Sequence, residues 1–286
     1  MDKPYVERFI TVQDGLRLYV RDYPGPADSA LPPILCLGGL TRNCKDFAGL
    51  AKFHAKARRV ICPDMRGRGR SDYDPVWQNY YPATYVGDVK HILTALGIHE
   101  VVVVGTSMGG IMGMAMSAAM PGGLKALVIN DVGPVVRRSN LGSIVESMKH
   151  PPRLNSWEEA GQHLRDVYGS EIPITDQAAW VHAAHQSYKE MPDGHISYDF
   201  DPNIVKPLLA DAPPRLDLWY LFHGCARTPT LTVRGGKSEI LWAELFEEMK
   251  HVRPDMEWVE VPEYGHAPSL SEPECKEVLN DFLGRH

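Results

Sequence analysis

The fold is decided by the stretch Val101-Val102-Val103-Val104-Gly105-Thr106-Ser107-Met108-Gly109-Gly110. Its four successive valines are typical of a strand that is buried on both faces of a sheet. The glycines around Ser107 break this run, and residues 111–120 continue with a helical composition. No charge occurs between Glu100 and Lys125, but the break favours a strand, a sharp turn and a buried helix over a single membrane span.

The same alternation of strand and helix continues on both sides of this stretch. Strand-like runs are found at residues 9–12, 16–23, 33–37, 59–62, 126–129, 230–233 and 257–261, and helical patterns at 86–96, 240–249 and near 278–282. Alternating strands and helices predict an α/β fold with a mostly parallel, doubly wound sheet that is covered on both faces.

One segment interrupts this alternation. Between about Gly133 and Pro213 there is no convincing strand, and the composition shifts toward Pro, His, Trp and charged residues. We interpret it as a helical insertion. The expected organisation is therefore a core domain formed by residues 1–133 and 214–286, with a helical cap formed by residues 134–213.

Composition and charge exclude several classes of protein. The chain has 286 residues and a net charge of −6, so it is neither a disordered chain nor one with strong affinity for nucleic acid. Five cysteines, an odd number with no CxxC pair, indicate reduced thiols; they are Cys36, Cys44, Cys62, Cys225 and Cys275. The charged N-terminus does not match an export signal, and we expect a cytoplasmic protein that binds no membrane.

Chemistry is indicated by two residues that are far apart in the sequence. Ser107 is the centre of a G-x-S-x-G pattern between a strand and a helix, the context in which this motif presents a nucleophile. A serine hydroxyl needs a base to activate it. Among 12 histidines, His266 follows the last strand and precedes the last helix. It should therefore lie at the carboxyl edge of the sheet, where open α/β sheets keep their sites.

Two other patterns favour structural roles. His182 and His185 form an HxxH pair in the insertion, but no Cys or acidic partner stands at ligand spacing, so no metal site is expected. The stretch Arg66-Gly67-Arg68-Gly69 lacks the Gly-Lys-Ser/Thr of a phosphate-binding loop. We interpret it as a turn.

The order of motifs along the whole chain resembles the α/β-hydrolase fold family with a helical cap. Five segments carry this resemblance: Leu37-Gly38-Gly39-Leu40-Thr41, residues 64–71, the serine turn, an acidic loop at residues 234–241 and the histidine loop at residues 263–268. The resemblance implies the chain order Ser, acid, His and no cofactor. It also implies an oxyanion hole from the backbone N–H groups of Leu40 and Met108.

The acid has two candidates. Glu239 follows the strand at residues 230–233, where the family's acid usually lies, and it is the expected partner of Ser107 and His266. Asp131, directly after the strand at residues 126–129, is the alternative. The chain also has Gly38-Gly39 where many relatives have His-Gly, so a side chain that usually braces the oxyanion loop is missing.

The resemblance implies a serine hydrolase that acts on a small carboxylic ester or lactone. Two alternatives remain open: hydrolysis of carbon–carbon bonds in ring-fission products, in which Arg137 and Arg138 could bind a substrate carboxylate, and a ligand-sensing protein that retains the triad. The cap is expected to select the substrate, with Trp180 and Tyr188 either lining the pocket or packing the cap.

Overall fold

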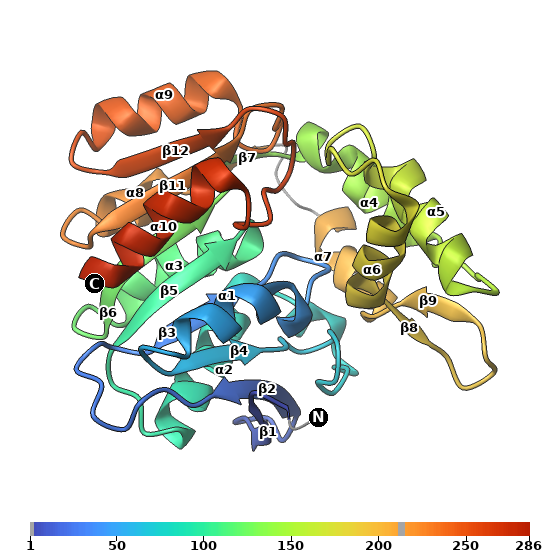
Figure 1. Cartoon of the computed structure of the whole chain (residues 1–286), viewed down its shortest axis with the longest axis horizontal. Coiled ribbons are helices and arrows are strands. Elements are labelled where there is room, and N and C mark those ends of the chain that lie inside the picture. Colours follow the sequence, from blue (N-terminus) through green and yellow to red (C-terminus); the bar gives the residue numbers. More distant parts are fainter. Residues whose placement is uncertain (1–2, 211–214) are drawn as a thin grey trace.

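A mostly parallel sheet of eight strands forms the centre of the computed structural model, which describes residues 3–210 and 215–286 (Figure 1). The strand order is β1-β2-β4-β3-β5-β6-β11-β12, and only β2 runs antiparallel to its neighbours. The strands are β1 (Val6–Thr11), β2 (Arg17–Tyr23), β3 (Ile34–Leu37), β4 (Val60–Pro63), β5 (Val101–Thr106), β6 (Leu124–Asn130), β11 (Thr230–Gly235) and β12 (Glu257–Val261). This confirms the predicted α/β class and its mostly parallel sheet.

Helices cover both faces of the sheet because the central strands are apolar on both faces. In β5, Val103 packs with the helices of one face and Val104 with those of the other. The first face carries α2 (Pro82–Ala95), α3 (Met108–Ala119), α8 (Trp219–Gly224) and α9 (Ala243–Val252); the second carries α1 (Ala48–His54) and α10 (Pro273–Arg285). Two 3-10 turns, η1 (Cys44–Phe47) and η2 (Trp77–Asn79), lie in the connecting loops.

The state of the cysteines and the character of the helices can be given for all described residues. All five cysteines are buried free thiols. Of the helices within residues 3–210 and 215–286, none combines the length and apolar character needed to cross a bilayer.

The insertion lies on one side of the core (Figure 1). It begins with a short strand that pairs with one just after it, β7 (Val135–Arg137) with β10 (Arg215–Asp217). Between them are η3 (Arg138–Leu141), α4 (Gly142–Lys149), α5 (Trp157–Tyr168), α6 (Gln177–Ser187), β8 (Tyr188–Glu190), β9 (Ile196–Tyr198), η4 (Pro202–Val205) and α7 (Lys206–Leu209). The expected boundary between residues 213 and 214 lies outside the described residues.

The expectation of an insertion without strands was wrong in one respect. The strands β8 and β9 form an antiparallel hairpin, and β7 is a third strand within the segment. Each has only three residues, too few for alternation to be visible in the sequence. The turn chemistry is visible, because Gly194, which follows Asp193, has a φ of 86°, and Asp-Gly is a hairpin signal.

The insertion has an apolar core of its own. The helices α5 and α6 pack against each other, and Trp180 of α6 is fully buried between them and the β8–β9 hairpin. The other buried members of this cluster are Ala160, Leu164, Ala184, Tyr188 and Ile196. The position of the cap residues is therefore set within the cap as well as by its contacts with the core.

Candidate active site

Ser107 sits on a strained turn between β5 and α3. Its backbone angles are φ 53° and ψ −115°, which are rare for a residue with a side chain. The two glycines of the motif permit this turn, because a Cβ on Gly105 would lie 2.3 Å from the Gly109 carbonyl oxygen and one on Gly109 would lie 2.1 Å from that of Leu37. The turn places the Ser107 side chain at the carboxyl edge of the sheet.

His266 links Ser107 to a carboxylate. Its Nε2 is 2.9 Å from Ser107 Oγ, and its Nδ1 is 2.7 Å from Asp131 Oδ2. Because an ionised carboxylate can only accept, the proton belongs on Nδ1, which leaves Nε2 free to accept the hydroxyl proton of Ser107. The Asp131 carboxylate is fully buried and the His266 side chain is 12% exposed, so water competes little for these hydrogen bonds.

Asp131 is held by β11, the strand next to its own. It directly follows β6, and its N–H donates to the Val233 carbonyl at 2.8 Å. Its Oδ1 accepts the Gly235 N–H at 2.8 Å, and its Oδ2 accepts the Ser238 hydroxyl at 2.6 Å in addition to His266. Three donors therefore orient this carboxylate and stabilise its charge.

The expectation that Glu239 lies against His266 was wrong, because the structure places Asp131 there. The Glu239 side chain is exposed and makes no hydrogen bond or ion pair within the described residues. The residue that turns inward after β11 is its neighbour Ser238, whose hydroxyl contacts Asp131. The Nδ1 of His266 is thus hydrogen-bonded to Asp131, the alternative acid that the sequence offered.

The two expected oxyanion donors are oriented by the carbonyls of their own peptide groups. In a trans peptide the C=O and N–H point in opposite directions. The Gly39 carbonyl accepts the Arg42 N–H at 3.1 Å, which fixes the direction of the Leu40 N–H. The Ser107 carbonyl accepts the Gly110 N–H at 2.9 Å inside α3, so the Met108 N–H points out of the helix N-terminus.

Arg68, which the sequence predicted only as part of a turn, stabilises the loop that carries Leu40. Arg68 is fully buried, and its Nε donates to the Leu40 carbonyl at 2.8 Å. Its Nη1 donates both to the Arg66 carbonyl at 2.7 Å and to the Tyr85 hydroxyl at 2.9 Å. Arg68 therefore supports the loop of Leu40, in which Gly38 stands where many relatives have a histidine.

A cavity of about 260 Å³ opens beside Ser107 and His266. Its core side includes Leu40 and Phe47, and its cap side is formed largely by Leu164, Tyr168, Ile172, Ile174, Trp180 and Ala183. Burial raises the pKa of the Tyr168 phenol, so this side chain is neutral. Trp180 both packs the cap and lines the cavity, whereas Tyr188 is buried in the cap core.

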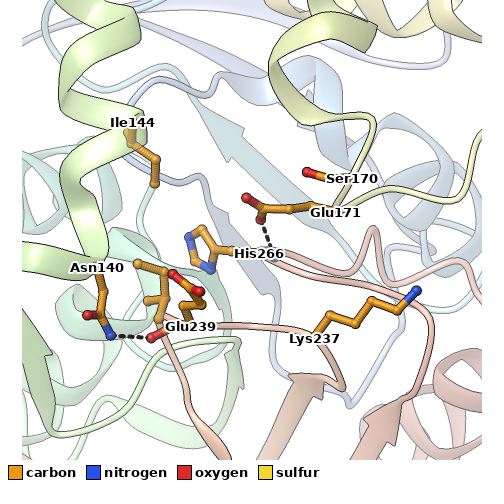
Figure 2. A pocket seen from close by; sticks show the side chains of 8 residues that line it. Asn140, Ile144, Ser170, Glu171, Lys237, Glu239 and His266 are labelled. Atoms are coloured by element: carbon orange, nitrogen blue, oxygen red, sulfur yellow. Dashed lines mark hydrogen bonds between the residues drawn. The ribbon is translucent and has the colours of Figure 1, made fainter.

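A second cavity of about 270 Å³ lies beside His266 and is more polar. Figure 2 shows Asn140, Lys237 and Glu239 around it, with Glu171 reaching toward His266 from the cap. Glu171, Ile144 and His266 line both cavities. The catalytic histidine candidate therefore stands between an apolar space and a polar one.

The remaining residues named from the sequence lie elsewhere. The Arg137 guanidinium lies 4.0 Å from the ring centroid of Trp242, and neither Arg137 nor Arg138 lines these two cavities. His185 stacks on Trp157, with ring centroids 3.7 Å apart. No cluster of His, Cys, Asp and Glu side chains suited to a metal ion occurs in the part of the chain that the structure describes.

The fold and the site together define an α/β hydrolase. Residues 32–144 match the family model described as the alpha/beta hydrolase fold. The chain is 32% identical over 266 residues to a 3-hydroxybutyrate-oligomer hydrolase of Cupriavidus necator, covering 90% of each chain. An alpha/beta hydrolase from Novosphingobium aromaticivorans is similar over the full length of both chains, with a TM-score of 0.93 and 38% identity.

A crystallised putative hydrolase from Rickettsia typhi gives a TM-score of 0.86 at 26% identity, again over 100% of both chains. The chain belongs to the α/β-hydrolase fold family, as its motifs indicated.

Proposed function

We propose that the protein is a serine hydrolase that cleaves a small carboxylic ester or lactone through an acyl-enzyme. The observation that carries this proposal is the hydrogen-bonded chain from Asp131 through His266 to Ser107. This arrangement can move a proton away from the serine hydroxyl as it attacks a carbonyl carbon.

In the first half of the reaction, His266 accepts the proton of Ser107 while the serine oxygen attacks the carbonyl. The Leu40 and Met108 N–H groups stabilise the negative charge that develops on the carbonyl oxygen. The resulting imidazolium, stabilised by Asp131, then gives its proton to the leaving oxygen, and the alcohol departs. Water, deprotonated by His266, releases the acid from Ser107 in the second half.

The shape and chemistry of the cavities support an ester with an apolar acyl part. On its cap side, the cavity beside Ser107 is lined largely by aliphatic and aromatic side chains, and the space on the other side of His266 is more polar. The relative from Cupriavidus necator acts on 3-hydroxybutyrate oligomers, and oligomers of a hydroxy acid are joined by ester bonds. An arrangement with the acyl group in the apolar cavity and the alcohol on the polar side agrees with the linings of the two cavities.

The first test is covalent labelling. A fluorophosphonate probe should modify Ser107, and Ser107→Ala should lose both the labelling and at least about 10⁴-fold in kcat on p-nitrophenyl esters. An adduct mapped to another residue, or an alanine variant with near-normal turnover, contradicts the proposal. Rapid multiple turnover of simple esters and 3-hydroxybutyrate dimers separates an enzyme from a ligand-sensing protein, which would release its product slowly.

A further inference from the structure

Glu171 of the cap is hydrogen-bonded to the loop that carries His266. Its side-chain Oε2 accepts the backbone N–H of His266 at 2.9 Å, and its own carbonyl accepts the Gly265 N–H at 2.6 Å. One cap residue therefore fixes two consecutive peptide groups of the loop that carries the histidine. Figure 2 shows this side chain directed at His266 from the cap side.

The surfaces on the two sides of this contact are fitted to each other. A Cβ added to Gly265 would lie 2.7 Å from Glu171 Cβ and 2.9 Å from both its Cγ and its Oε2. A real Cβ essentially never has a non-bonded neighbour this close, so only a glycine at position 265 allows Glu171 to approach the loop. The close approach at Gly265 is thus part of the same contact as the hydrogen bonds.

The position of Glu171 is set by the cap. Its N–H donates to the Tyr168 carbonyl at 2.9 Å, and the Ile172 N–H donates to the same oxygen at 3.0 Å. These bonds extend the end of α5 as a tight turn, and α5 packs on α6 in the apolar core of the cap. Any displacement of α5 relative to the sheet would therefore move the acceptor away from the His266 N–H.

We propose that Glu171 is a positioning residue that holds the histidine loop from the cap and keeps His266 in line with Ser107 and Asp131. This inference rests on the proposed function, since it concerns the base of that reaction. Glu171 does not take part in bond making. It acts through the backbone of His266, whose ring must satisfy Ser107 and Asp131 at the same time. A misplacement of about 1 Å in such a group can cost up to about 10²-fold in rate.

Two substitutions separate the hydrogen bond from the charge. Glu171→Ala removes the side-chain acceptor, and kcat on a p-nitrophenyl ester should fall on the order of 10-fold while KM changes by less than about 3-fold. Glu171→Gln keeps an oxygen that accepts the His266 N–H, and its kcat should stay within about 3-fold of the parent. The rate of fluorophosphonate labelling should follow kcat, because labelling also needs His266 to activate Ser107.

The matched control is Glu190→Gln, which changes an exposed carboxylate on β8 of the same cap and should leave kcat, KM and labelling unchanged. Melting temperatures of all variants show whether the fold is retained.

A second pair of variants tests the contact itself. Gly265→Ala alone should lower kcat strongly, since its new methyl group would collide with Glu171. In a Glu171→Gly background the three nearest atoms are gone, and adding Gly265→Ala should cost much less. An equal cost of Gly265→Ala in both backgrounds overturns the inference, as does parental kcat in Glu171→Ala or a Glu171→Gln variant that loses as much as alanine.

The two proposals fail in different ways. If the parent protein neither reacts with the probe at Ser107 nor hydrolyses esters, the proposed function is wrong and the role of Glu171 falls with it. If the parent is labelled and active but the Glu171 variants match it, only the positioning role is wrong.

Discussion

The most informative single change is Asp131→Asn, because the structure dictates how the new amide must turn. The Gly235 N–H, 2.8 Å from Oδ1, requires an acceptor at that position. The oxygen of the amide must therefore face Gly235, and its NH₂ group must face His266 and Ser238. A donor at this point forces His266 Nδ1 to become the acceptor, so the ring proton moves to Nε2. The proton then lies between the ring and Ser107 Oγ, where the reaction needs a lone pair.

We expect this wrong tautomer to cost about 10³- to 10⁴-fold in kcat, which corresponds to about 4–5 kcal/mol of transition-state stabilisation. The substitution should not disturb the backbone, although Asp131 has a φ of 56°, because asparagine tolerates this conformation well. Steady-state hydrolysis of a p-nitrophenyl ester measures the loss, and circular dichroism shows that the variant is folded.

The matched control is Glu239→Gln, which removes an exposed carboxylate beside the same histidine and should change kcat by less than about 3-fold. A Glu239→Gln variant that loses more activity than Asp131→Asn would refute the assignment of the acid to Asp131.

Two further outcomes follow from the cap and from a buried histidine. Ala183 lines the apolar cavity, so Ala183→Leu should shift the preference toward shorter acyl chains by about 1–3 kcal/mol per methylene excluded; an unchanged profile across acetate, butyrate and hexanoate esters contradicts a role for this wall in acyl selection. Burial lowers the pKa of His54 from 6.5 to about 4, with the Arg58 charge as a second cause. The unfolded chain therefore binds the proton first as the pH falls from about 6.5 toward 4, and stability decreases in that window, by at most roughly 2 kcal/mol at pH 4.5. Urea unfolding at pH 8 and pH 4.5 should show a smaller acid loss in His54→Gln, and identical losses in the two proteins would exclude this effect.

The parts of the molecule that were predictable are those determined by local sequence. The valine run, the glycines around Ser107 and the helical residues after them specify a strand, a turn and a helix without reference to the rest of the chain. His266 was also predictable, because its place between the last strand and the last helix puts it at the carboxyl edge of the sheet. The structure brings these two residues within hydrogen-bond distance.

The acid could not be decided in the same way. Asp131 and Glu239 both follow parallel strands, and these strands are neighbours in the sheet, so position along the chain does not separate them. The choice depends on which side chain turns inward after β11, and that position belongs to Ser238. A signal was present, since Asp131 is the first residue after a fully buried strand end, but its meaning depends on tertiary contacts.

The roles of Arg68 and Glu171 could not be predicted from the sequence for a similar reason. Arg68 and Glu171 act on backbone groups of Leu40 and His266, which are distant in sequence. No periodicity or short motif marks a side chain whose partner is a remote peptide group. Their roles follow only from the packed structure.

The short ribbon of β7 and β10 bears on how the sheet can assemble with an insertion in its middle. The strands β6 and β11 pair although the joined residues, such as Leu127 and Thr230, are about 100 residues apart. The ribbon sets Val135 opposite Asp217, so once it has formed only about 20 residues remain in the loop that must still close. The entropy of loop closure depends on the logarithm of loop length, and this shortening favours the pairing of β6 with β11 by about 1.4 kcal/mol. The α5–α6 pair, whose contacts are local, can form early. The chain can thus carry a long insertion without slowing the closure of its central sheet in proportion to the insertion's length.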